Sequence, residues 1–150
     1  MTTIVYDHKN RQIACDGLVV RDGVILSTKF EKYFVRDGMV FLMAGSTCEF
    51  DEIIDMVCKG VKKTEVRTSS LCMYVQESIV AMVFIDSDGN VCTDVITHDD
   101  AIGSGENWAL AALDMGKSAH DAVEYASTRD IYTGGSVLVF DVENMRFVNA

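Results

Sequence analysis

The chain contains no proline at all, and this absence limits its domain organisation. Proline makes up about 5% of an average protein, and linkers between domains are often rich in it. A length of 150 residues suits one domain, with enough chain to bury roughly two-thirds of its unfolded surface. We therefore expect a single domain over residues 1–150, without an extended linker or a second module.

Long apolar runs and clustered positive charges are also missing. The longest apolar runs, Met39–Ala44 and Ile79–Ile85, are far shorter than the ~20 residues of a membrane-spanning helix, and no secretory leader is recognisable. The net charge of -10 argues against nucleic acid as a partner, because phosphate recognition needs clustered Lys and Arg. Hydrophobic residues make up 49% of the chain and charged residues 24%, as is typical of globular proteins. These features predict a cytoplasmic protein that binds neither membrane nor nucleic acid.

Metal, disulfide and nucleotide motifs are absent or incomplete. The five cysteines form no CxxC pair and several lie in apolar runs, which predicts buried reduced thiols. Cys15 ends an alternating strand, so we expect a packed side chain there and not a Cys–His nucleophile. The three histidines have no metal-ligand spacing such as HExxH. Asp86–Asn90 lacks the spacing of a calcium loop, and Trp108 stands at the third glycine position of the dinucleotide motif that Gly103-Ser104-Gly105 would begin.

The hydrophobic pattern predicts strands and helices in alternating groups. Two Asp-Gly turns and alternating apolar residues predict an antiparallel meander in the N-terminal third, with strands at Thr3–Tyr6, Gln12–Ala14, Val24–Ser27, Tyr33–Val35 and Met39–Met43. Helical spacing predicts a helix at Cys48–Lys63, and a second, weaker helical piece is expected at Ser69–Glu77. The remaining elements are strands at Ile79–Ile85 and Val91–Ile96, helices at Asn107–Met115 and Ser118–Ser127, and strands at Val137–Val142 and Met145–Val148. This order predicts an α+β fold in which two antiparallel sheets lie between helix pairs.

A threonine follows the initiator methionine. Cytosolic processing normally removes Met1 when the next residue is small, which would leave a hydroxyl and a free α-amine together on Thr2. Threonine paired with its own terminal amine is a known nucleophile, and an amine with a pKa of about 7.7 is well suited to act as a base at neutral pH. Many ordinary proteins begin with Met-Thr, so this signal is weak without the motifs that accompany it.

Five further motifs follow Thr2 along the chain. They are Cys15-Asp16-Gly17, Lys32, Ala44-Gly45-Ser46, Ile102-Gly103-Ser104-Gly105 and Arg129-Asp130-Ile131-Tyr132-Thr133-Gly134-Gly135. In this order they resemble the N-terminal threonine hydrolases of the proteasome β-subunit and HslV type, and the resemblance covers essentially the whole chain. Two departures are that Ser46 replaces the family's second glycine and that the stretch between Lys63 and Ile79 is shorter than in most members.

The resemblance implies a four-layer αββα sandwich, the N-terminal nucleophile hydrolase fold, and a threonine-type endopeptidase that forms an acyl-enzyme on Thr2. In this scheme Asp16 holds Lys32, and the Lys32 ammonium supplies a positive field at the nucleophile. The oxyanion would accept the N–H of Gly45, while the amine and a water would be bound by Ser104 and Asp130. The implied substrate pocket is mainly apolar and consists of Val19, Phe30, Phe34, Met43 and Thr47. The chemistry needs no cofactor, and a structural cation is implied at the backbone of Ser127, Asp130 and Thr133.

The resemblance also implies partners, because members of this family close into rings. We expect homo-oligomeric rings, unfolded polypeptide as substrate and an ATPase unfoldase as partner. Three alternatives remain open: a catalytically inactive ring-forming subunit, an amidase of the same superfamily that acts on a small-molecule amide, and a generic sandwich domain with an accidental Met-Thr start. The intact set of catalytic residue types argues against the first alternative, and the joint pattern of motifs argues against the last.

Overall fold

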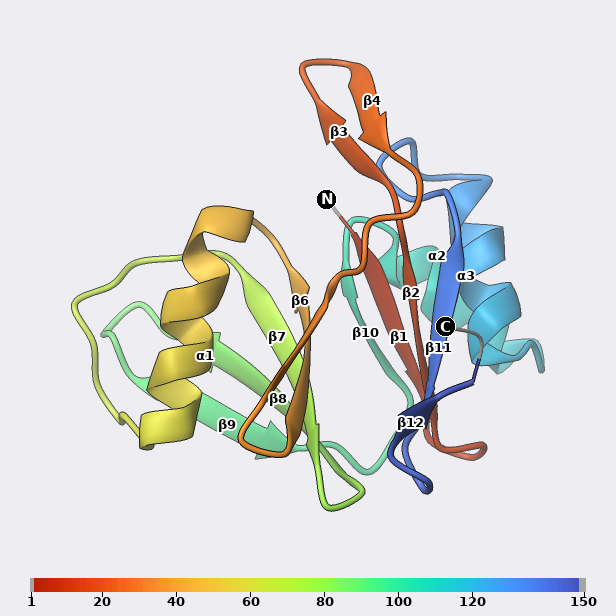
Figure 1. Ribbon diagram of the computed structural model, residues 1–150. Helices are drawn as coiled ribbons and strands as arrows, with labels where there is room; N and C mark the ends of the chain where they lie inside the picture. The colour runs from red at the N-terminus through yellow and green to blue at the C-terminus, as the bar shows by residue number, and fades with distance from the viewer. Residues whose placement is uncertain (1, 149–150) are drawn as a thin grey trace.

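The strands form two five-stranded antiparallel sheets that face each other in a computed structural model, which describes residues 2–148 (Figure 1). The first sheet has the order β10-β1-β2-β11-β12, with bounds Asp100–Gly103, Thr3–Asp7, Gln12–Asp16, Val137–Asp141 and Arg146–Phe147. The second has the order β5-β6-β7-β8-β9, with bounds Tyr33–Arg36, Met39–Ala44, Leu71–Gln76, Ile79–Ile85 and Val91–Val95. The first sheet therefore combines strands from both ends of the chain, whereas the second is built from consecutive strands.

Helices cover the outer face of each sheet (Figure 1). Helix α1 (Phe50–Lys59), preceded by the short 3-10 turn η1 (Thr47–Glu49), packs on the second sheet, and helices α2 (Glu106–Asp114) and α3 (Ala119–Ser127) pack on the first. The main core lies between the sheets, where Ile4, Leu42 and Phe140 are fully or almost fully buried. The predicted α+β, four-layer αββα sandwich is confirmed.

The segment Ser69–Glu77 differs from its predicted helical structure. Leu71–Gln76 is the strand β7, hydrogen-bonded between β6 and β8 in the middle of the second sheet. Helix α1 is also shorter than predicted, because Gly60 takes a left-handed conformation with φ of 66° and ends it. One outer layer is thus a single helix and not the expected pair.

The N-terminal third is three separate hairpins, and not one continuous meander. Strands β1 and β2 pair in the first sheet, β5 and β6 pair in the second, and β3 (Val19–Arg21) and β4 (Val24–Ser27) form a separate two-stranded hairpin. Both turn residues of this hairpin, Asp22 and Gly23, have positive φ, as a type I′ turn requires. The hairpin projects beyond the sandwich (Figure 1).

The cysteines are all free, but only two of the five are buried. Burial raises the pKa of the Cys15 thiol to about 12 and also raises that of Cys72, so both remain protonated and unreactive at neutral pH. Cys48 is exposed, and Cys58 and Cys92 are half-buried. The expectation of buried thiols therefore holds for Cys15 and Cys72 alone. Among residues 2–148, no helix is both long and apolar enough to cross a membrane.

Candidate active site

Thr2 lies at the start of β1, a strand with neighbours on both sides and all five of its residues buried. The Thr2 carbonyl accepts the backbone N–H of Ser104 at 2.8 Å, which ties Thr2 to the end of β10. A Cβ on Gly103 would lie 1.8 Å from that carbonyl oxygen, and the φ of this residue is +103°. Glycine is therefore required at position 103, and the first of the glycines in the Ile102–Gly105 motif has a structural role in holding Thr2.

The Asp16 carboxylate connects three of the motifs. Its Oδ1 accepts the backbone N–H of Thr3 at 3.0 Å and the Lys32 ammonium at 2.9 Å, and its Oδ2 accepts the N–H of Gly134 at 3.0 Å. Asp16 and Lys32 are both buried, and a buried ion pair of this kind is satisfied only when such further hydrogen bonds complete it. One carboxylate thus fixes the Thr2-Thr3 peptide, the lysine and the Arg129–Gly135 segment relative to one another.

Asp130 is the centre of a second hydrogen-bonded group. Its Oδ2 accepts the hydroxyls of Ser104 and Thr133, its Oδ1 accepts the N–H of Tyr132, and the Thr133 hydroxyl in turn lies 2.6 Å from that of Thr3. Burial works to raise the pKa of Asp130, but the hydrogen bonds from Ser104, Thr133 and Tyr132 together lower it below its ordinary value. Asp130 is therefore an ionised acceptor that holds Ser104 beside Thr2.

The Gly45 turn follows the end of β6 and is held by a side chain that the sequence did not single out. Gly45 has a φ of +138°, and a Cβ there would lie 2.2 Å from the Ser70 hydroxyl. This hydroxyl accepts the N–H of Ser46 at 3.1 Å and donates to Glu49 at 2.5 Å. Hydrogen bonds from Ser70 and Thr68 lower the pKa of Glu49, so the acceptor that orients Ser70 is ionised. Ser70 was not predicted as a site residue, because the segment that contains it was predicted to be helical.

Two cavities meet at Thr2 and Gly45. The larger has a volume of about 360 Å³ and is also lined by Lys32. It is here called the hairpin cavity because residues of the β3–β4 hairpin line it. Its other lining residues are Leu18, Val19, Val20, Arg21, Leu26, Phe30, Met43, Ser46, Thr47, Cys48 and Phe50. The smaller, of about 260 Å³, is here called the Glu106 cavity; its other lining residues are Ala44, Ser69, Leu71, Gly103, Ser104 and Glu106. A chain bound across Thr2 could therefore occupy a cavity on each side of this residue.

The structure brings together four of the five residues predicted to form the substrate pocket. Val19, Phe30, Met43 and Thr47 line the hairpin cavity, but Phe34 does not: its ring packs edge-on against Phe50 at a centroid distance of 5.9 Å. Neighbouring residues of a strand point to opposite faces. Tyr33 packs on the core between the sheets, so Phe34 must point toward α1.

Several residues of the hairpin cavity were not anticipated, and Arg21 is the most consequential of them. It introduces a positive charge into a pocket that the sequence predicted to be mainly apolar. Arg21 belongs to a three-residue strand that is too short for a clear alternation, and only the packing of the hairpin brings it to the cavity. No local sequence signal could have identified it.

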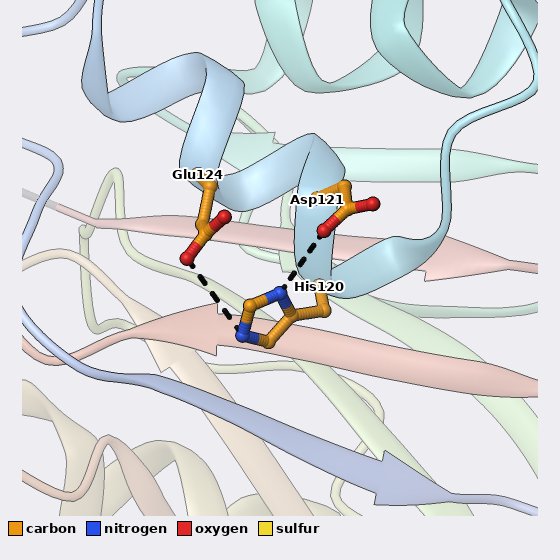
Figure 2. Close-up of side chains that lie close together, drawn as sticks. All are labelled: His120, Asp121 and Glu124. Atoms are coloured by element: carbon orange, nitrogen blue, oxygen red, sulfur yellow. Dashed lines mark hydrogen bonds and ion pairs between the residues drawn. The ribbon is translucent and has the colours of Figure 1, made fainter.

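Two possible cation sites lie outside the cavities. The carbonyls of Ser127, Asp130 and Thr133 follow one another at and beyond the C-terminal end of α3, where oxygen donors and the helix dipole both favour a cation; the donor types therefore fit the implied ion. His120, Asp121 and Glu124 form the other group on the exposed face of α3 (Figure 2). There the two carboxylates approach different nitrogens of one imidazole, at 3.3 and 3.9 Å, which is the arrangement of a surface charge cluster.

No known family model and no curated protein sequence matches this chain, but solved structures match it over most of its length. Eukaryotic HslV from Trypanosoma brucei superposes with a TM-score of 0.68 at 20% identity, covering 93% of this chain and 99% of that one. The BPH protein of Thiobacillus denitrificans in complex with epoxomicin gives a TM-score of 0.66 at 15% identity, covering 93% and 97%. The chain has the fold of HslV and BPH. A further BPH structure gives 0.65 at 15% identity, covering 93% and 96%.

The HslV and BPH fold explains the arrangement of the motifs. The segments that resemble the family in sequence, around residues 16, 32, 45, 104 and 130, are far apart in the chain, and hydrogen bonds or a shared cavity connect each of them to Thr2 or Thr3. At 15–20% identity the likeness establishes the fold, and the chemistry must be argued from the residues themselves.

Proposed function

We propose that this protein is a threonine peptidase of the HslV and proteasome type, with Thr2 as its N-terminal nucleophile after removal of Met1. Met1 lies outside the described residues, so the proposal rests on the surroundings of Thr2. The observation that carries it is the shared Asp16 oxygen, which places the Lys32 ammonium beside the Thr2-Thr3 peptide. Lys32 also lines the hairpin cavity together with Thr2, and a buried cation at that position suits a hydroxyl that must ionise.

The reaction begins with attack of the Thr2 hydroxyl on the carbonyl carbon of the substrate. The Thr2 α-amine takes the hydroxyl proton, and the Lys32 ammonium favours both the alkoxide and the unprotonated amine. The substrate oxygen becomes an oxyanion, which accepts the N–H of Gly45; a donor in this role contributes roughly 3–4 kcal/mol in comparable sites. When the C–N bond breaks, the α-amine returns the proton to the leaving amine, and an ester on Thr2 remains.

Hydrolysis of the ester completes the cycle. A water attacks the ester carbonyl while the α-amine takes its proton, and the Thr2 oxygen leaves and is reprotonated. Ser104 donates to Asp130 and lies beside the Thr2 carbonyl, so it is placed to orient the amine or that water. The chemistry consumes water and peptide alone. The cation proposed at the backbone of Ser127, Asp130 and Thr133 would have a structural role.

The fold comparison also supports the proposal at the level of the ligand. One of the structures with this fold, BPH, was solved in complex with epoxomicin. We propose that the present chain likewise reacts with peptide epoxyketones, acts in the cytoplasm on unfolded polypeptides, and forms homo-oligomeric rings that an ATPase unfoldase supplies. The mostly apolar walls of the hairpin cavity, including Phe30 and Met43, favour apolar residues on the acyl side of the cleaved bond.

Substitution of the nucleophile tests the function directly. We expect the active protein to lack Met1 by intact mass, and Thr2→Ala to lower hydrolysis of a fluorogenic peptide at least about a thousandfold while the circular dichroism spectrum is unchanged. Thr93→Ala, an exposed threonine on β9, is the matched control and should retain activity. A peptide epoxyketone should modify Thr2 and no other residue. Full activity in a preparation that retains Met1, or in Thr2→Ala, would refute the assignment.

A further inference from the structure

We propose that Glu106 makes this site selective for a positively charged residue on the leaving-group side of the cleaved bond. The proposal rests on the proposed function and concerns the preferred substrate of the same site. It is carried by the charges of the two cavities that meet at Thr2, by the position of Glu106, and by the direction in which the leaving amine departs.

The two cavities carry opposite charges. Among the described residues that line the hairpin cavity there are two cations, Arg21 and Lys32, and no acidic side chain. The described residues that line the Glu106 cavity include one acid, Glu106, and no lysine or arginine. The polarity therefore changes from positive to negative across the nucleophile. Because the chain has a net charge of -10, a cavity of this size lined by two cations and no acid stands out from the rest of the surface.

Glu106 is available to a ligand. It is half-buried in the first turn of α2, and its carboxylate makes no hydrogen bond or ion pair with any other residue in the range 2–148. An acidic side chain in the first turn of a helix also interacts favourably with the helix dipole. The helix dipole would stabilise an acidic side chain in this turn even if it faced solvent. It therefore does not explain why Glu106 lines the same cavity as Thr2.

The leaving group departs toward the Glu106 cavity. The backbone carbonyl of Thr2 accepts a hydrogen bond from the N–H of Ser104. Ser104 lines the Glu106 cavity, whereas Lys32 lines the hairpin cavity. The α-amine belongs to the Thr2 backbone and delivers the proton to the leaving amine. The acyl part of the substrate therefore occupies the hairpin cavity, and the residue that follows the cleaved bond meets Glu106. A lysine or arginine at that position would gain an ion pair that an uncharged residue lacks.

Two quenched-fluorescent peptides test this inference. They share an apolar residue before the cleaved bond and differ only after it, where one carries lysine and the other the uncharged norleucine. We expect the native enzyme to cleave the lysine peptide with about threefold to fivefold higher kcat/KM, the range of a partly exposed ion pair. Glu106→Gln should remove this preference and Glu106→Lys should reverse it. High salt should reduce the preference in the native enzyme, because exposed charges are screened.

Glu52→Gln is the matched control. Glu52 also lies in the first turn of a helix, α1, but it is exposed and lines neither cavity, so this variant should retain the lysine preference. Thr2-dependent cleavage of both peptides at equal rates would overturn the role of Glu106 and leave the proposed function standing. The absence of any Thr2-dependent cleavage would overturn both. An equal loss of lysine preference in Glu52→Gln would assign the effect to the net charge of the protein.

Discussion

Asp16 has two separable roles at the residue scale. Its carboxylate contacts both the Thr3 N–H and the Lys32 ammonium, and it also binds the N–H groups of Leu18 and Gly134. Removing Lys32 leaves Asp16 with three backbone donors. Removing the charge of Asp16 breaks the buried ion pair that it forms with Lys32. The two substitutions therefore have different consequences for stability and for rate.

We predict that Lys32→Ala impairs the reaction more, and Asp16→Asn the stability more. Lys32→Ala should lower kcat by about 10²–10³, the effect of removing one electrostatic contribution at a comparable site. Asp16→Asn should reduce the free energy of unfolding by about 3–5 kcal/mol, as for a buried pair that loses one partner, with a smaller loss of kcat. Urea unfolding and peptide hydrolysis measure the two effects, with the exposed Lys29→Ala as control. Native turnover in Lys32→Ala would show that the lysine is a bystander.

Individual site residues could be predicted where a motif marks them. Thr2, Asp16 and Lys32 are unremarkable one by one, and only their order along the chain indicated a site. Glu106 follows directly on the Gly103–Gly105 motif but resembles any acidic residue at a helix start. Its approach to Thr2 depends on how β10 and β1 pair, which is a property of the folded sheet and not of the local sequence.

At the element scale, the turn after β6 depends on its neighbour β7. The Ser70 hydroxyl lies 2.2 Å from where a Cβ on Gly45 would be, and it accepts the N–H of Ser46. We infer that Ser70 is a positioning residue: it orients the turn that carries the proposed oxyanion donor without lining either cavity.

We predict that Ser70→Ala lowers kcat about tenfold with little change in KM, since the misplacement of an oxyanion donor affects the transition state more than substrate binding. Ser87→Ala, in the exposed turn between β8 and β9, is the control and should behave as the native enzyme. Steady-state kinetics on one fluorogenic peptide separates the two constants. A rise in KM at unchanged kcat would mean that Ser70 acts on substrate binding instead.

Strand β7 shows where the sequence pattern fails for an element. A central strand with covered faces reads as a nearly continuous apolar run, and in a short run of this kind periodicity cannot distinguish a strand from a buried helix. Residues 71–75 form such a run, with Cys72, Met73 and Val75 fully buried. By contrast, the five strands predicted in the first third and its two Asp-Gly turns are present, because turn chemistry specifies them locally. The short strand β3 was not predicted, and neither was the division of the three hairpins among the two large sheets and a separate two-stranded one.

At the scale of the whole molecule, the β3–β4 hairpin offers a contact surface. Its strand β4 exposes three consecutive large aliphatic residues, Val24, Ile25 and Leu26, with exposed fractions of 58%, 62% and 48%. An isolated two-stranded hairpin has little stability of its own in water, so association with another subunit would stabilise it. The surface therefore suits the ring assembly that we propose.

We predict that the native protein is a closed homo-oligomer by light scattering at micromolar concentration, as most soluble homo-oligomers are. Ile25→Glu should shift it toward smaller species, because it places a charge in an apolar contact. Ile79→Glu is the control: Ile79 is also exposed, at 52%, but lies away from the hairpin, so assembly should be unaffected. A strictly monomeric protein with full peptidase activity would contradict an enclosed chamber and favour an amidase that acts on small substrates.

The topology also sets the order in which this molecule can acquire its structure. The second sheet pairs consecutive strands, and contacts that are local in sequence close early in folding. The first sheet must instead join β1 and β2 to β10 and β11, across about a hundred residues or more. During synthesis, Ser104 and Asp130 are added only after about two-thirds of the chain has been made. The proposed active site is consequently one of the last parts of the molecule to form, so a nascent chain would not carry an assembled nucleophile while the rest of the domain is still unfolded.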